Sequence, residues 1–283
     1  MRPTPRRRLV LTLAATAVVL CVAAAIYAQA PRGRISRWAE TVGRVALPQD
    51  FDGGFQFCRI AFAPDFRGDG RGAAWEVDYP RADINLSIRM AELTKTPVSF
   101  DALGDPRPLV MRLTDDVMFQ CPFLMMTEVG NASISPPEAE RLREYLLKGG
   151  FLWADDFWGS YAWEWWAAQI NQVLPSEAFP IVDLPPDHGL FNSQFQIPGV
   201  PQIASINHWR ASGGGTSERG ADSAVPHARA ILDEQGRIMV LMTHNTDLGD
   251  SFEREGDDPQ YFYQMSVPGY AFGVNTLLYA LTH

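Results

Sequence analysis

Asp155 and Asp156 are adjacent carboxylates that follow a short apolar run, residues 151–154, and precede Trp158. Two carboxyl groups at a site that excludes water can have different pKa values, and a general acid paired with a general base requires such a difference. Adjacent residues of a strand point in different directions, so one of the two would face a cleft while the other caps a helix. We expect a ligand-binding or catalytic role for at least one of them.

A second group of polar residues follows the apolar run 237–242. His244 would lie on the same rim as Asp155 if the sheet is parallel there, and Glu128 ends a third apolar run, residues 122–127. His, Asp and Glu assembled in this way could perform acid-base catalysis.

Side chains of the types that bind divalent metals also recur in this region, but their spacing matches no metal motif. A helix cap or a solvated acidic loop is the favoured interpretation, and we expect no metal and no other cofactor. The residues concerned are His244, Asp247, Asp250 and Glu253.

The loop 63–80 alternates acids and arginines around Trp75. Its glycines would let the backbone approach a ligand closely or move over it as a lid. A solvated, self-neutralising loop is the alternative. We favour a part in the site, because the loop leaves the first predicted strand, residues 55–62, at the same rim. Its charged residues are Asp65, Arg67, Asp69, Arg71, Glu76 and Asp78.

Aromatic side chains are concentrated next to the two carboxylates. Exposed indoles beside carboxylates can stack on sugar rings, whereas buried indoles fill a core. Only part of the series can share one helix face, so a core role is favoured over ligand stacking. The series comprises Trp153, Phe157, Trp158, Tyr161, Trp163, Trp165 and Trp166.

The elements that must position these residues alternate between strands and helices. Ser135 can cap a helix that Gly149 or Gly150 closes, and the apolar run that follows is typical of a strand buried on both faces. This alternation predicts an α/β fold with a mainly parallel sheet and one late antiparallel pair, in which ligands bind beyond the carboxyl ends of the strands. Helices are expected at residues 82–93, 136–148, 161–173 and 267–281, strands at 55–62, 98–100, 109–113, 122–127 and 151–154, a hairpin at 228–232 and 237–242, irregular structure at 180–201 and an exposed, mobile loop at 211–224.

The N-terminus has the pattern of an export signal. Four arginines precede an uncharged stretch, residues 9–26, and Ala28-Gln29-Ala30 fits a cleavage site. An uncleaved anchor is the alternative, because about 18 apolar residues approach the length that spans a bilayer. We expect residues 1–30 to be a signal peptide or signal anchor, residues 31–54 a lead-in and residues 55–283 a domain outside the cytoplasm, periplasmic or anchored to the inner membrane facing outward.

The charge and the cysteines fit such a location. Seven of the 24 Lys and Arg residues lie in the first 37 residues, which hold no acid, so the remainder has 17 basic and 33 acidic side chains and a formal charge of −16. Such a domain would repel nucleic acid. Beyond the signal only Cys58 and Cys121 remain. They could form a disulfide or stay as two buried thiols.

One set of segments is informative together: residues 57–60, 122–126, the helix end at 149–150, and residues 151–156, 243–250 and 274–275. This set resembles the bacterial domain of unknown function numbered 4159. This resemblance implies a branch of the class I glutamine-amidotransferase-like superfamily, with a flavodoxin-like three-layer sandwich, and it implies export rather than a mechanism. Catalytic members of that superfamily carry a cysteine on a tight strand-to-helix turn. Here Asp155 and Asp156 stand at the comparable strand end, so the resemblance does not extend to glutamine amidotransfer.

Two functions follow from these observations. The first is a binding module of the cell envelope, with an acidic, Trp-lined cleft for a glycan, a peptide or an envelope protein, and with no membrane contact beyond an uncleaved N-terminal segment. The second is a hydrolase that uses Asp155, Asp156 and His244 as acid-base or metal-binding groups, helped by Glu128. The absence of a nucleophile motif favours the first. Its candidate ligand-binding residues are Asp65, Arg67, Trp75, Glu128, Trp158, Asn245 and Asp247.

Overall fold

The computed structural model describes residues 44–69 and 75–283, which belong to one compact unit. The predicted signal or anchor segment, residues 1–30, lies outside the described residues, as does Arg71. In the part of the chain that is described, no helix is long and apolar enough to cross a membrane.

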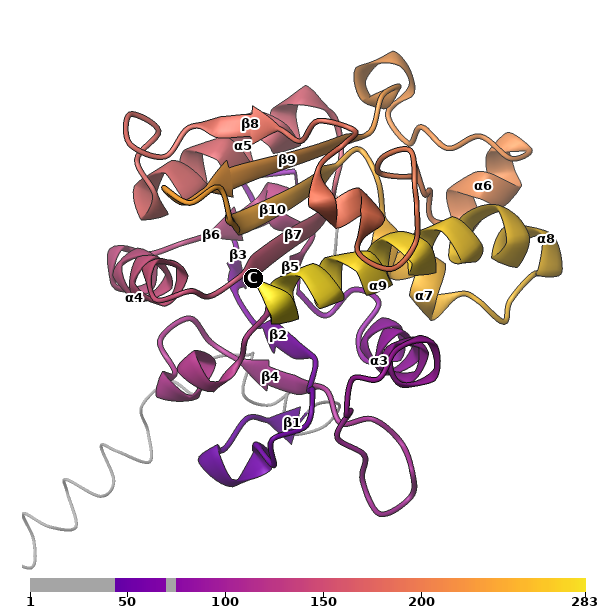
Figure 1. Cartoon of the computed structure of the whole chain (residues 1–283). Helices are drawn as coiled ribbons and strands as arrows, with labels where there is room; N and C mark the ends of the chain where they lie inside the picture. Colours follow the sequence, from indigo (N-terminus) through magenta and orange to yellow (C-terminus); the bar gives the residue numbers. More distant parts are fainter. Residues whose placement is uncertain (1–43, 70–74) are drawn as a thin grey trace, which may run out of the picture. The chain divides into compact units, whose positions relative to one another are not determined.

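An eight-stranded sheet forms the centre of the fold, in the order β1-β4-β2-β5-β7-β10-β9-β8 (Figure 1). Neighbours from β1 to β10 pair parallel, whereas β9 pairs antiparallel with both β10 and β8. The order β4-β2-β5-β7-β10 is the 2-1-3-4-5 order of flavodoxin-like folds. The predicted fold class is therefore confirmed. The strands are β1 (Arg44–Val45), β2 (Cys58–Ile60), β4 (Leu109–Met111), β5 (Leu124–Thr127), β7 (Leu152–Phe157), β8 (Ile181–Asp183), β9 (His227–Leu232) and β10 (Ile238–His244), and a separate pair is β3 (Ala63–Pro64) with β6 (Ala132–Ser133).

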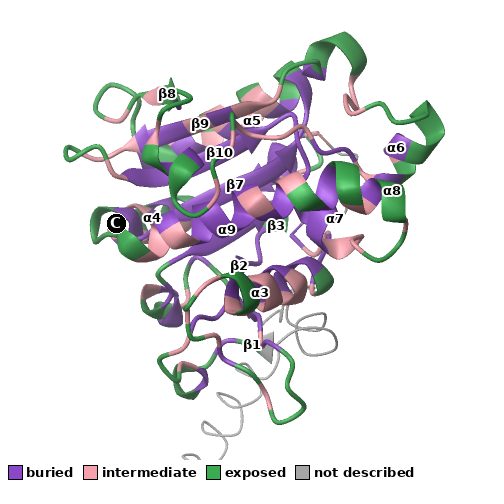
Figure 2. Cartoon of the chain, turned by 45° about the vertical axis from the view of Figure 1, so that its right-hand side comes forward, coloured by how far each residue is buried: buried purple, intermediate pink, exposed green. Residues whose placement is uncertain are grey.

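Helices cover both faces of the sheet. The helices α3, α7 and α9 contact one another on one face, and α4 and α5 lie on the other (Figure 1). The central strands β2, β4, β5, β7 and β10 and the inner sides of these helices are buried, which leaves the polar sides of the helices exposed (Figure 2). The helices are α3 (Arg81–Leu93), α4 (Pro136–Leu147), α5 (Gly159–Val173), α6 (Ile206–Ser212), α7 (Leu248–Glu253), α8 (Pro259–Tyr261) and α9 (Val267–Thr282), with a π-helical stretch at Phe262–Ser266.

The helix and strand that lead to the two carboxylates form as the sequence predicts. Glu138 accepts a hydrogen bond from the backbone N–H of Ser135, and the two prolines that follow occupy the first helical positions. The strand β7 is longer than predicted and contains both carboxylates, because pairing with β5 continues to Asp155 and pairing with β10 continues to Phe157. All six of its residues are buried.

Several segments differ from the sequence-based expectation. Residues 98–100, an expected strand, form only isolated bridges at Val98 and Phe100. The lead-in contributes β1, which pairs with β4. The segment 180–201 contains β8, which is held by β9 at the edge of the sheet. The segment 211–224 is largely exposed, as expected, but it contains a short 3₁₀ helix, Gly220–Ser223, in which Ser223 is fully buried. Tertiary contacts that local composition does not encode order this segment.

Cys58 and Cys121 form a disulfide with an S–S distance of 2.08 Å. The bond joins β2 to the residues before β5 and so lies toward the amino ends of these strands, away from the edge that carries Asp156. Both cysteines of the described residues are therefore bonded, and neither is free to act as a nucleophile.

Candidate functional site

A cavity of about 390 Å³ lies beyond the carboxyl ends of β5, β7 and β10. This is the edge at which open parallel sheets bind ligands. The lining is strongly acidic, with eight carboxylates and two arginines. They are Asp69, Asp78, Glu128, Asp156, Glu218, Asp247, Asp250 and Glu253, with Arg219 and Arg254.

The backbone turns sharply around this cavity. Four non-glycine residues have left-handed backbone angles, with φ of 62° at Asp78, 54° at Glu128, 55° at Asp156 and 61° at Asn245. Asp and Asn adopt this region more readily than other residues, but it is sparsely populated for all of them. Glu128 directly follows β5 and Asn245 directly follows β10, so the chain bends at each strand end rather than continuing past the cavity.

Asp155 and Asp156 have different surroundings. The Asp155 carboxylate is fully buried and accepts hydrogen bonds from Thr243 Oγ1 and from the backbone N–H groups of Leu248 (2.9 Å) and Gly249 (3.2 Å), the first two residues of α7. Asp156 lines the cavity and accepts one hydrogen bond, 3.0 Å long, from Trp158 Nε1. Asp155 therefore stabilises a helix start, and Asp156 faces the cavity.

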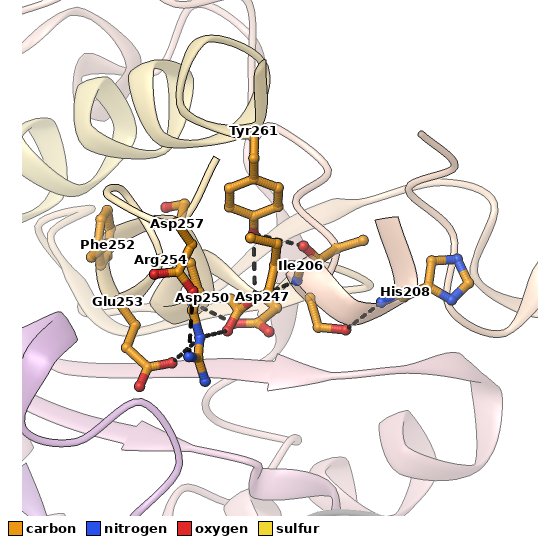
Figure 3. Close-up of polar contacts among 12 residues, drawn as sticks. Ile206, His208, Asp247, Asp250, Phe252, Glu253, Arg254, Asp257 and Tyr261 are labelled. Atoms are coloured by element: carbon orange, nitrogen blue, oxygen red, sulfur yellow. Dashed lines mark hydrogen bonds and ion pairs between the residues drawn. The ribbon is translucent and has the colours of Figure 1, made fainter. Parts of the chain in front are cut away.

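The start of α7 brings two further carboxylates to the cavity (Figure 3). Asp247 caps the helix by accepting from Asp250 N at 2.8 Å. Asp250 in turn accepts from Ile206 N and, at 3.4 Å, from the Tyr261 hydroxyl. The predicted cap is present, and the same residues also line the site.

A buried ion pair holds the loop that carries Asp78. Arg59 of β2 and Asp83 of α3 are both at most 1% exposed and bond to each other, with Arg59 Nε 2.9 Å from Asp83 Oδ2. The remaining donors of Arg59 bond to the carbonyl oxygens of Trp75 and Val77, each at 3.2 Å. Arg59 thus fixes the backbone directly before Asp78.

The other candidates in this loop do not line the cavity. Asp65 and Arg67 pair with each other, and the Arg67 side chain is 83% exposed. Trp75 is buried and packs against Tyr79. Asp69, by contrast, lines the cavity and pairs with Arg219 at 3.0 Å.

Burial and mutual repulsion raise the pKa of the cavity carboxylates. Burial is the largest cause at Asp78, Asp156 and Asp247, and neighbouring carboxylates raise the pKa of each further. The same causes raise the pKa of Glu128 to about 7, and burial raises that of Asp250 to about 6. The cavity therefore favours any species that supplies positive charge, whether a proton, a cationic group or a metal ion.

The expected convergence of His244 with the two aspartates does not occur. His244 ends β10 at the same edge, but its Nε2 lies 3.0 Å from the Gly159 carbonyl oxygen and its Nδ1 lies 3.2 Å from Arg229. Its ring packs against Phe157 and Trp163, outside the cavity lining. Burial, followed by the charge of Arg229, lowers the pKa of His244 to about 4 despite the Gly159 contact.

The Asn245 side chain is also bonded to backbone groups outside the cavity. Its Oδ1 accepts from Gly159 N and its Nδ2 donates to the Val225 carbonyl oxygen, each at 2.8 Å. Asn245 thus ties the end of β10 to the start of α5 and does not contact the cavity.

Only part of the aromatic series fills the core, and Tyr161 is exposed. Trp153 and Trp166 are fully buried, and Trp165 donates to the Ala132 carbonyl oxygen. Trp163 packs beneath Arg229. Two members of the series, Phe157 and Trp158, line the cavity.

Sequence reasoning missed Glu218 and Arg219. They come from the segment that was expected to be an exposed loop, and they reach the cavity because Glu218 accepts from Ser205 N (2.8 Å) and Arg219 pairs with Asp69. No local pattern in the sequence signals either contact.

Comparison with curated proteins gives no match to this chain. A family model matches residues 63–281, which include every strand from β3 onward and all the acidic residues of the cavity. The match spans well over half of the chain, and the chain therefore belongs to the family described as domain of unknown function DUF4159.

Proposed function

We propose that this protein is a binding module of the cell envelope, and that its acidic cavity takes a positively charged ligand or a positively charged group of a partner. One observation carries this proposal, the presence of eight carboxylates against two arginines in a single cavity at the carboxyl edge of the sheet. Buried charges require compensation, and the protein itself supplies only part of it.

The geometry favours binding over hydrolysis. A hydrolase built on Asp155, Asp156 and His244 needs these groups within reach of one substrate. Asp155 is occupied by three donors, and both ring nitrogens of His244 are engaged outside the cavity.

Titration of the full chain with spermidine tests the proposal. Polyglutamate serves as the anionic control and should not bind. Glu128 lines the cavity, so Glu128→Gln should weaken spermidine binding. Glu234→Gln is the matched control, because Glu234 is exposed in the turn between β9 and β10, at the amino end of β10. Binding should also weaken as salt is raised. Failure of spermidine to bind, or equal weakening in both variants, refutes the proposal.

The envelope location is a separate part of the proposal. The basic, then apolar N-terminus and the Cys58–Cys121 disulfide support it, because disulfides persist in oxidising compartments. Alkaline phosphatase fused to the C-terminus should be active in intact cells if the chain is exported. An inactive fusion at equal expression would refute export.

A further inference from the structure

Three of the cavity carboxylates lie close enough to share one ion. Asp78, Asp156 and Asp247 each offer a carboxylate oxygen within 4.8 Å of the other two, and each residue is at most 7% exposed. Two oxygens bound on opposite sides of a Ca²⁺ ion are about 4.8 Å apart, since a Ca–O distance is about 2.4 Å. The separation is therefore within the span of one coordination sphere.

A neighbouring group of carboxylates has the same spacing but already has a cation. Asp78, Asp250 and Glu253 also lie within 4.8 Å of one another. Arg254 Nε lies 2.6 Å from Glu253 Oε2 and 3.6 Å from Asp250 Oδ1 (Figure 3). The Arg254 guanidinium thus supplies the positive charge that this group requires.

The group formed by Asp78, Asp156 and Asp247 has no comparable counter-ion. Within residues 44–69 and 75–283, no lysine or arginine forms an ion pair with any of the three. Arg59 lowers the pKa of Asp78 from a distance, but its guanidinium is bonded to Asp83. Three buried carboxylates without a cation are unfavourable unless protons or an external cation neutralise them.

An unpartnered oxygen points to the same place. No described residue donates a hydrogen bond to Asp78 Oδ2, although Asp78 is 93% buried and lines the cavity. The absence of a side chain at position 249 leaves room for this carboxylate, since a Cβ built on Gly249 would be 2.1 Å from Asp78 Oδ2. A buried acceptor without a donor requires an explanation, and a bound ion beside the three carboxylates supplies one.

We propose that Asp78, Asp156 and Asp247 bind one hard divalent cation, of the Ca²⁺, Mg²⁺ or Mn²⁺ class. Three carboxylate oxygens without a histidine or thiolate select this class over zinc or copper. The inference rests on the proposed function, because it names the cation that the acidic cavity takes.

Calorimetric titration of the full chain with CaCl₂, MgCl₂ and MnCl₂ tests the inference. One ion should bind per chain, and Asp247→Asn should weaken binding by at least about tenfold because it removes one charged ligand. Asparagine caps helices as well as aspartate, so α7 should remain folded. Glu234→Gln is the matched control, since Glu234 is exposed in the turn between β9 and β10, and it should change the affinity less than about threefold.

Terbium luminescence locates the ion. Trp158 bonds to Asp156 and should sensitise Tb³⁺ emission from the site. Trp158→Phe should reduce this emission, and calorimetric Ca²⁺ binding should persist because the carboxylate ligands remain. Unchanged emission in Trp158→Phe places the ion elsewhere and overturns the proposal.

The remaining outcomes separate the two proposals. Absence of saturable divalent binding, or equal weakening by Glu234→Gln and Asp247→Asn, overturns the metal site. If spermidine still binds in that case, the proposed function stands without the metal. If divalent ions bind and spermidine does not, the metal site stands and the organic-cation function fails.

Discussion

Asp155→Ala should strongly destabilise the protein. The substitution removes the acceptor of the Leu248 and Gly249 backbone N–H groups at a fully buried position. A buried donor that loses its partner costs about 1–3 kcal/mol, so the free energy of unfolding should fall by about 2–6 kcal/mol. That is a large part of the roughly 5–15 kcal/mol that stabilises a typical domain.

Two matched substitutions separate the hydrogen bonds from other effects. Asp155→Asn keeps one acceptor oxygen and should lose about half as much stability as Asp155→Ala. Asp156→Asn keeps an acceptor for Trp158, tolerates the left-handed backbone and removes a repelled charge, so its unfolding free energy should stay within about 0.5 kcal/mol of wild type or rise.

Urea denaturation followed by circular dichroism at neutral pH, without added divalent ions, measures these differences. The reasoning fails if Asp155→Ala unfolds within about 0.5 kcal/mol of wild type. It also fails if Asp156→Asn is the more destabilised of the two, because the roles given to the adjacent carboxylates would then be reversed.

Three further predictions concern stability. His244 has a pKa of about 4 in the folded protein, below the ~6.5 of an unfolded chain, so the unfolded state takes up the proton first as pH falls. The His244 contribution to the unfolding free energy should therefore drop by about 3 kcal/mol between pH 6.5 and pH 4, whereas the cavity carboxylates with raised pKa contribute in the opposite direction. Urea titrations across this range should show a smaller drop, or a larger rise, in His244→Gln than in wild type. Replacing Cys58 and Cys121 by alanine should lower the unfolding free energy by about 4 kcal/mol, because the disulfide closes a loop with a sequence separation of 63. Reduced wild-type protein should have the same unfolding free energy as this variant in urea titrations. Gly249→Ala should destabilise the protein by about 1–3 kcal/mol, because the new Cβ would clash with Asp78. Gly256→Ala, with nothing within 4 Å, should change stability by less than about 0.5 kcal/mol. Equal changes in melting temperature for the two variants would contradict this.

The sequence contained enough information to locate the edge of the sheet at which the cavity lies. Glu128, Asp156 and Asp247 stand at or shortly after the ends of three apolar runs. These runs form the neighbouring parallel strands β5, β7 and β10, and parallel strands bring their carboxyl ends to one edge. Glu128, Trp158 and Asp247 could therefore be proposed before any coordinates.

Side-chain direction could not be predicted in the same way. Asp155 and Asp156 have the same type and adjacent positions, and only the left-handed angle at Asp156 and the amides of α7 distinguish them. His244 reaches the correct edge, yet the packing of Arg229 and Trp163 turns its ring away. Such outcomes depend on contacts between residues distant in sequence, which periodicity does not encode.

The left-handed backbone at Asp78, Glu128 and Asp156 has a consequence for protein engineering. Introducing the carboxylates of Asp78, Glu128 and Asp156 into another sheet of the same strand order would not reproduce the cavity. Strand ends without the left-handed backbone would direct the new side chains elsewhere. A faithful graft would also have to carry the bends themselves, together with the Arg59–Asp83 support beneath the Asp78 loop. The backbone conformation at these positions must therefore be transferred together with the acidic side chains, because the side chains alone would not form the site.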